Sequence, residues 1–413
     1  MITFKKHILP NGLRVVIHED ISSPMVAINV VYDVGSRDES PDKTGFAHLF
    51  EHLMFGGSVN VPDFDGPIQN AGGENNAFTN TDMTNFYNVL PAQNLETALW
   101  LESDRMKQLV FSQKALDVQK KVVVEEFKET CLTEPYGDVW HYLSDLSYKK
   151  HSYSWPTIGK DMSHIEEAEL DDVKRFFNKH YTPQNAILVI SGKVDAAHAL
   201  SLVEKWFADI PSGEKYTRKL IQEPVQSDFR AKTVYGNVPL PAVYISFHMV
   251  ARDHKDYYAY DLLSDVLSNG RSSRLYQRLH KVNPIFSQID AYISGTFDPG
   301  MLVIEGRPMK DVTLEDAKAT IWKELNELRD IAIDDTELQK LKNKIESSLE
   351  YSEVNILHKS MSLAYFELLG DASLINKEAE EYQKVTSADI QRVAREIFAK
   401  ENCTELTYLP NEN

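Results

Sequence analysis

The chain has 413 residues, of which 42% are hydrophobic and 26% charged, so it is long enough for two or three globular domains with sizeable cores. Its formal net charge of −18 argues against nucleic acids and anionic membranes as partners. The two cysteines, Cys131 and Cys403, lie far apart and imply neither a disulfide framework nor a cysteine metal site. No apolar run is long enough to span a bilayer, and residues 1–7 lack the core of an export signal. We therefore expect a cytoplasmic protein, although a chain from which a signal had been removed would look the same.

The first half alternates strand and helix patterns. An Asn-Gly turn at 11–12 between two apolar runs predicts a hairpin, and 71–76 reads as a turn or loop. The other predicted elements, in chain order, are a strand at 25–34, a short helix within 45–57, a strand at 85–90, helices at 95–106, 112–131 and 171–180, and a buried strand at 185–190. This order predicts an α+β fold in which a mostly antiparallel sheet is covered by helices.

The second half repeats this order after a polar segment. Residues 211–228 are weakly patterned and form the best linker candidate. A strand at 242–249 and a helix at 257–267 then take the places of the earlier strand at 25–34 and the helix within 45–57. We therefore predict two similar domains from an internal duplication, 1–210 and 229–413, joined by 211–228.

The helix within 45–57 carries the most informative motif, His-x-x-Glu-His. His48 and His52 are four residues apart, so both imidazoles leave the same helix face, with Glu51 beside them. Two neutral nitrogen ligands and a carboxylate base are what a catalytic zinc site needs, and this order is the inverse of the commoner zincin motif. The alternative is that both histidines are core residues. The corresponding helix of the second half has no such motif, so we expect only the first half to bind metal.

A catalytic zinc site needs a third protein ligand and one open position. The run 119–129 contains three consecutive valines, which suggests a buried helix in which a carboxylate would be out of place unless it is paired or metal-bound. Helical periodicity places Glu126 on the face of Val122 and Val123. Glu125 and Glu129 are the alternatives.

The chain resembles the pitrilysin/insulinase family of zinc peptidases. The resemblance is to the single-unit bacterial branch, which is similar to the beta subunit of mitochondrial processing peptidase. It extends over nearly the whole chain, through the segments 9–15, 45–55, 72–79, 98–106, 122–126, 135–138, 155–159, 181–186, 191–192 and 272–275. The resemblance identifies Glu126, at the end of the valine run, as the third zinc ligand.

The resemblance implies metal-assisted hydrolysis of peptides. One Zn²⁺ per chain would activate water, and Glu51 would act as general base and then as general acid. The segment Asn76, Ala77, Phe78 and Thr79 resembles the edge strand along which a substrate peptide lies; the alternative is an ordinary strand. The implied substrates are short or unfolded peptides held in a chamber shaped like a clamshell.

The chain departs from the family pattern at several positions. Gln119 stands where relatives often have a glutamate that supports the site from outside the ligand shell. His280 and Ser287 stand where active relatives carry an arginine and a tyrosine that reach the substrate. Loss of such a transition-state donor typically costs about 10²–10³ in rate.

These departures leave two arrangements and three classes of function to consider. A zinc-less partner chain would supply the missing groups in a heterodimer, or a homodimer would use Arg271 or Arg278. The function we expect is zinc endopeptidase. The alternatives are a non-catalytic peptide-binding or scaffolding subunit, and a metal-binding module without catalysis, which is disfavoured because structural zinc sites usually close all four positions.

Overall fold

A computed structural model describes residues 1–219 and 221–411. The chain forms two compact units, each built around one β-sheet. The first unit contains Met1–Lys128, Trp155–Ile221 and Glu350–Lys377, and the second contains Glu129–Ser154, Gln222–Leu349 and Glu378–Asn413. The chain therefore passes between the units several times. The predicted division into 1–210, 211–228 and 229–413 stays a prediction, and one of these passages, Ile221 to Gln222, lies within 211–228.

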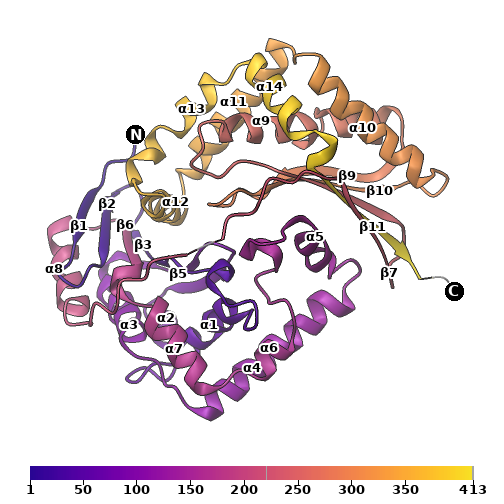
Figure 1. Cartoon of the computed structure of the whole chain (residues 1–413). Helices are drawn as coiled ribbons and strands as arrows, with labels where there is room; N and C mark the ends of the chain where they lie inside the picture. The colour runs from indigo at the N-terminus through magenta and orange to yellow at the C-terminus, as the bar shows by residue number, and fades with distance from the viewer. Residues whose placement is uncertain (220, 412–413) are drawn as a thin grey trace. The chain divides into compact units, whose positions relative to one another are not determined.

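The sheet of the first unit has the strand order β1-β2-β6-β3-β5-β4. Figure 1 labels the first five of these strands. Neighbouring strands are antiparallel except β2 and β6, which are parallel. β3 and β6 are central and carry almost continuous apolar sequences, as expected for strands covered on both faces. The strands are β1 (Lys5–Ile8), β2 (Arg14–Glu19), β3 (Met25–Tyr32), β4 (Glu74–Thr79), β5 (Thr84–Pro91) and β6 (Ala186–Gly192).

The sheet of the second unit repeats this topology. Its order is β7-β11-β8-β10-β9, with β7 and β11 parallel and the remaining pairs antiparallel. Numbered in chain order, β2 to β6 of the first sheet and β7 to β11 of the second have the same arrangement, 1-5-2-4-3. The predicted α+β fold with two similar halves is confirmed. The strands are β7 (Arg230–Gly236), β8 (Ala242–His248), β9 (Phe286–Ile293), β10 (Met301–Pro308) and β11 (Cys403–Pro410).

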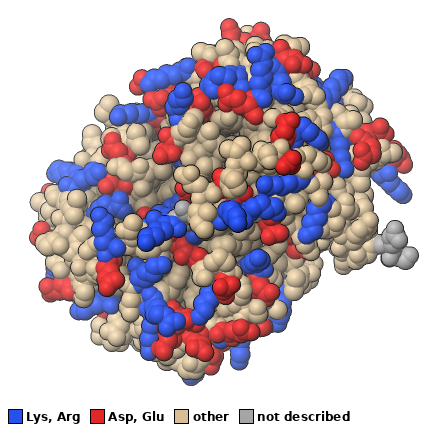
Figure 2. All heavy atoms as spheres, viewed as in Figure 1, with Lys and Arg blue, Asp and Glu red and all other residues tan. Residues whose placement is uncertain are grey.

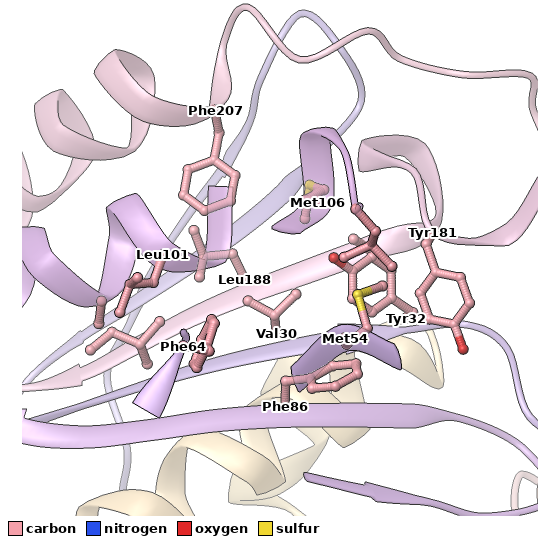
Figure 3. Close-up of a cluster of buried hydrophobic side chains, with 14 of the residues drawn as sticks. Val30, Tyr32, Met54, Phe64, Phe86, Leu101, Met106, Tyr181, Leu188 and Phe207 are labelled. Carbon is pink, nitrogen blue, oxygen red and sulfur yellow. The ribbon is translucent and has the colours of Figure 1, made fainter. Parts of the chain in front are cut away.

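Helices cover both faces of the first sheet. The main core lies between one sheet face and the helices of the first half; Figure 3 shows part of it, with Phe86 of β5, Tyr181 and Phe207 among its rings. The other face of β3 and β6 packs against α12, with Leu363 and Ala364 at the contact. The helices of this unit are α1 (Phe46–Phe55), α2 (Asp65–Asn70), α3 (Leu95–Lys107), α4 (Gln113–Phe127), α6 (Ser163–Glu166), α7 (Leu170–His180), α8 (Ala196–Phe207) and α12 (Ile356–Leu368).

The second sheet is covered in the same way. Val243, Ile245 and Phe247 of β8 face one core, while Tyr244 faces another that contains Leu143 of α5. Thus α5, from the first half of the sequence, covers the second sheet, and α12, from the second half, covers the first. The helices of this unit are α5 (Val139–Ser147), α9 (Tyr257–Ser268), α10 (Leu314–Asp330), α11 (Asp335–Ser352), α13 (Glu378–Lys384) and α14 (Ser387–Ile397).

Local predictions hold with two corrections. The Asn-Gly hairpin forms, and the Asn11 side chain donates hydrogen bonds to the carbonyl oxygens of Phe207 and Ile210 at the end of α8. The predicted loop 71–76 is wrong at its end, because β4 begins at Glu74 through pairing with β5. The predicted helix 112–131 starts as expected, with Ser112 Oγ accepting from Ala115 N, but the α-helix ends at Phe127 and continues as a π-helical turn, Lys128–Thr133.

No helix in residues 1–219 and 221–411 is long and apolar enough to cross a membrane. On the face shown in Figure 2, lysine and arginine side chains are interspersed with aspartate and glutamate. The acidic excess of the composition therefore does not form one continuous patch on that face.

His180, at the end of α7, makes the stability of the first unit depend on pH. Its side chain is fully buried between Phe176 and Tyr216, and in the described part of the chain neither ring nitrogen has a hydrogen-bond partner. Burial lowers its pKa to about 3. Because the unfolded chain binds a proton near pH 6.5 and the folded chain does not, His180 removes stability as the pH falls from 6.5 towards 3.

We expect the free energy of unfolding to fall between pH 6 and pH 5 by about 1 kcal/mol more in the wild type than in His180→Gln, which does not titrate. Urea unfolding of both proteins at the two pH values measures the difference. Equal changes of the unfolding free energy in the two proteins would contradict this prediction. They would show that His180 binds a proton as readily in the folded state as in the unfolded chain.

Candidate metal centre

The helix α1 holds His48 and His52 on one face and buries the opposite one. Phe46, Leu49 and Phe50 of α1 are all buried in the first core. Phe50 stacks on Tyr181, with ring centroids 5.0 Å apart. This packing leaves the helix little freedom to rotate, so the direction of the two imidazoles is fixed.

The start of α1 is held by a buried carboxylate that the sequence analysis did not single out. Glu39 accepts hydrogen bonds from Gly45 N at 2.9 Å and Ala47 N at 2.8 Å, and also from Trp155 Nε1 at 3.1 Å. Burial raises the pKa of this carboxyl to about 8, against the effect of its three N–H donors. Its partner Trp155 begins the segment 155–159, one of the segments through which the chain resembles the family. That resemblance is the feature of the sequence that could have pointed to this contact.

The turn into α1 requires glycine. Gly45 has a φ of +86°, and a Cβ atom there would lie 2.8 Å from the carbonyl oxygen of Ile158. We expect Gly45→Ala to destabilise the protein by about 2–3 kcal/mol, from left-handed strain of about 1–2 kcal/mol plus the collision. Gly370 also has a positive φ, +113°, but no atom lies near its Cβ position. Gly370→Ala is therefore the control for strain alone, and equal losses of unfolding free energy in the two variants would contradict the account.

Glu126 of α4 completes a three-residue cluster. His52 Nε2 lies 3.3 Å from Glu126 Oε2 and His48 Nε2 lies 3.6 Å from Oε1, while the two Nε2 atoms are 3.3 Å apart. The hydrogen bond from His52 lowers the pKa of Glu126, and burial lowers the pKa of His48. Both effects favour the states that bind a metal, an ionised carboxylate and a neutral imidazole.

The spacing of these atoms fits a zinc ion. Four ligands at about 2.0–2.1 Å in a tetrahedron lie roughly 3.4 Å from one another. The two Nε2 atoms are 3.3 Å apart, and they lie 3.3 and 3.6 Å from the two different oxygens of Glu126. The donor set, two imidazole nitrogens and one carboxylate oxygen, is also one that zinc accepts. Within residues 1–219 and 221–411, this is the cluster of histidine, cysteine and acidic side chains that could hold a metal ion.

The structure corrects part of the reasoning that led to Glu126. Val123 and Val124 are buried as expected, but Val122 is 45% exposed, so the three valines do not share one face. The side chain of the alternative Glu125 is 71% exposed and pairs with Lys128. Glu129 is exposed and belongs to the π-helical turn. Of the three candidates, Glu126 is the one in contact with the histidines.

Glu51 lies next to this cluster and is held by β4. Thr79 Oγ1 donates a hydrogen bond of 2.6 Å to Glu51 Oε2, a contact that the sequence analysis missed because it assigned Thr79 to substrate binding only. Burial raises the pKa of Glu51. A carboxyl group with a raised pKa accepts and releases protons more readily near neutral pH.

β4, which contains Asn76, Ala77, Phe78 and Thr79, is an edge strand. It pairs with β5 on one side, and no strand within residues 1–219 and 221–411 pairs with its other side. The Asn76 side chain accepts a hydrogen bond from Ala77 N at 2.8 Å. The assignment of these residues to peptide binding stays a prediction.

Gln119 lies on α4 near the C-terminal end of α1. A Cβ atom at Gly56 would lie 3.6 Å from Gln119 Nε2. Gln119 also lines a small cleft of about 330 Å³ with Leu53 and Phe111. In the described part of the chain we find no hydrogen bond from Gln119 to His48 or His52, and its supporting role stays a prediction.

The residues at the expected arginine and tyrosine positions lie in the second unit and form local contacts. His280 Nδ1 is 3.1 Å from the carbonyl oxygen of Phe286, and Ser287 Oγ donates to the carbonyl oxygen of Arg307. Arg278 forms ion pairs with Glu324 and Glu327. Arg271 is exposed.

Two family models match the chain in series. Residues 14–159 match "Insulinase (Peptidase family M16)", and residues 167–345 match "Peptidase M16 inactive domain". Together they account for most of the chain. The first match contains the three residues of the metal cluster and also Glu51.

Two bacterial relatives are similar over almost their full length, and an Arabidopsis relative over about two thirds of its length. "Zinc protease PqqE" of Helicobacter pylori is 28% identical, covering 97% of this chain and 92% of the relative. "Uncharacterized zinc protease YmxG" of Bacillus subtilis is 26% identical, covering 96% of each. A "probable mitochondrial-processing peptidase subunit beta" of Arabidopsis thaliana is 24% identical, covering 83% of this chain and 66% of the relative.

Solved structures of peptidases have the same fold as this chain. The crystal structure of a protease from Helicobacter pylori superposes with a TM-score of 0.95 at 27% identity, covering 99% of this chain and 100% of the other. The fold and these matches define a two-unit α+β protein of the M16 peptidase type. The chain belongs to peptidase family M16, the insulinase family, whose members include proteins named as zinc proteases.

Proposed function

We propose that this chain is a zinc endopeptidase whose metal is held by His48, His52 and Glu126. The observation that carries the proposal is the convergence of the two imidazole Nε2 atoms and the Glu126 carboxylate, with contacts of 3.3–3.6 Å, beside a half-buried and hydrogen-bonded Glu51. A zinc ion bound there would polarise the scissile carbonyl and activate water. Three protein ligands leave one position open, as catalytic rather than structural zinc sites do.

Glu51 is proposed as the proton acceptor and donor. The Thr79 hydroxyl holds its Oε2, and the carboxylate would take a proton from water and pass one to the leaving amine. Thr79 therefore orients the base, and burial of Glu51 brings its proton affinity closer to that needed near neutral pH.

The substrate is proposed to be a short or unfolded peptide that pairs with β4. The edge of β4 offers main-chain groups next to Thr79, which contacts the base, so a peptide added along this edge would place a peptide bond near Glu51. Recognition through main-chain hydrogen bonds accepts many sequences but requires an extended chain.

A second chain is proposed to complete the site. His280 and Ser287 use their polar atoms locally, and Arg278 is neutralised by two carboxylates, which leaves the exposed Arg271 as the better placed arginine for a homodimer. A zinc-less relative that carries the arginine and tyrosine would serve equally in a heterodimer. The relative named as a beta subunit illustrates that proteins of this family act within complexes.

The experiment is hydrolysis of a quenched fluorescent peptide library by the purified chain, with its oligomeric state measured by sedimentation. We expect cleavage that a chelator abolishes and stoichiometric zinc restores. Cleavage that resists complete removal of zinc would contradict the proposal.

Two observations favour a second candidate, a non-catalytic peptide-binding subunit. The chain lacks the arginine and tyrosine of active relatives, and the family model for 167–345 is described as an inactive domain. Zinc binding and saturable peptide binding without cleavage, for monomer and dimer alike, would support this candidate over the enzyme.

A further inference from the structure

The first unit contains a second cleft, which has no part in the proposed hydrolysis. Its volume is about 730 Å³, within the range of small-molecule sites. Three segments form its walls: the C-terminal end of α3, the end of α7 with the residues that follow it, and the extended stretch 210–217 after α8.

The rim of this cleft is basic, in contrast to the whole chain. Lys107, Arg175, Lys179 and Lys215 line it, and among the described lining residues Glu214 is the one acidic side chain, so four cations face one carboxylate. The formal charge of the complete chain is −18. A concave basic site on an acidic protein concentrates small anions by electrostatic focusing.

The dipoles of α3 and α7 do not fully explain why these cations gather at the cleft. Cations at the ends of α3 and α7 complement the helix dipoles, and Arg175 also pairs with Asp172. Lys215, however, belongs to no helix, and it comes to the same cleft as Lys107 from a distant part of the sequence. In the described part of the chain neither of these two lysines forms an ion pair.

The inner wall of the cleft is apolar. Met106, Phe177, Tyr181 and Ile210 line it, and all four are buried. Near the rim, the Lys179 ammonium lies 4.7 Å from the ring centroid of Tyr216. These four side chains form the floor beneath the cleft, and an occupant would meet the accessible apolar surface of Pro211 and Tyr216 together with positive charge.

The wall formed by 210–217 has a defined shape. Gly213 has a φ of +73°, and a Cβ atom there would lie 2.5 Å from Thr182 Cγ2 on the opposite wall. Only glycine allows this close approach between two of the segments that line the cleft.

We propose that this cleft binds a small amphipathic organic anion, with its apolar body against Pro211 and the half-buried Tyr216 ring and its carboxylate, sulfonate or phosphate group at Lys107, Lys179 and Lys215. The size of the cleft, the apolar inner wall and the convergence of lysines from three segments all support this class of ligand. Inorganic anions lack the apolar body and should bind more weakly.

The test uses the aryl sulfonate 8-anilinonaphthalene-1-sulfonate, whose fluorescence rises when it binds an apolar site, with decanoate and inorganic phosphate as competitors. We expect the double variant Lys107→Ala/Lys215→Ala to raise the Kd about tenfold, roughly threefold for each exposed charge. Glu214→Gln should lower the Kd about threefold, because it removes the opposing carboxylate. Decanoate should displace the probe, and phosphate should do so only at far higher concentration.

Lys193→Ala is the matched control, an exposed lysine of the same unit outside the cleft. The altered side chains are exposed, so the variants should fold normally, and the readout does not depend on peptide hydrolysis. An unchanged Kd in the double variant and in Glu214→Gln would overturn the proposal, as would displacement of the probe by phosphate and decanoate at equal concentrations.

Discussion

Glu51→Gln is expected to lower kcat for peptide hydrolysis by about 10²–10⁴-fold, the usual contribution of a general acid–base, while zinc stays bound. The amide keeps the size of the carboxylate and an oxygen that can accept the Thr79 hydrogen bond, so the geometry of α1 and β4 is preserved. It cannot take a proton from water. The measurement is steady-state hydrolysis together with zinc content by mass spectrometry.

The zinc content serves as the control in this experiment. Loss of both zinc and activity would assign Glu51 to the metal ligands instead of to the base. Turnover within threefold of the wild type would contradict the role proposed for Glu51.

Glu126→Gln is expected to weaken zinc binding by at least about 100-fold, because replacing residues outside the ligand shell already costs 10- to 100-fold. Glu126 contributes the one negative charge among the three proposed ligands, and its oxygens face both histidines. Competition with a chromophoric chelator measures the affinity, and hydrolysis should fall in parallel at limiting zinc.

Glu125→Gln is the matched control for this variant. It removes the same charge one residue away, but the Glu125 side chain is exposed and paired with Lys128. We expect zinc affinity within a factor of two of the wild type. Similar losses in the two variants would mean that the net charge of α4, and not ligation by Glu126, governs zinc affinity.

Features set by nearby residues could be predicted from the sequence. The spacing of His48 and His52 fixes their common face through helix geometry alone, and the glycines after Phe55 mark the end of α1. The hairpin at Asn11–Gly12 and the N-cap at Ser112 are equally local.

Features set by tertiary packing could not be predicted. α5 and α12 are not among the helices predicted from the sequence, and each covers the sheet of the other half through contacts between distant segments. Contacts between Glu39 and the start of α1, and between Thr79 and Glu51, join segments that no sequence spacing relates. Val122 is exposed because α4 presents only part of its valine run to the core.

The choice of Glu126 over Glu125 and Glu129 shows most clearly what the sequence alone cannot decide. All three lie on one predicted helix, and their order alone cannot say which of them faces α1. The family resemblance selected Glu126, and the structure brings it to 3.3 Å from His52. The role of metal ligand stays a prediction until zinc is located.

Anomalous X-ray scattering at the zinc edge from crystals of the zinc-loaded chain is the most direct test of this metal centre. We predict one strong peak, at about 2.0–2.2 Å from His48 Nε2, His52 Nε2 and an oxygen of Glu126. A peak at another cluster, or full zinc loading without a peak between α1 and α4, would contradict the proposed site and the hydrolytic function built on it.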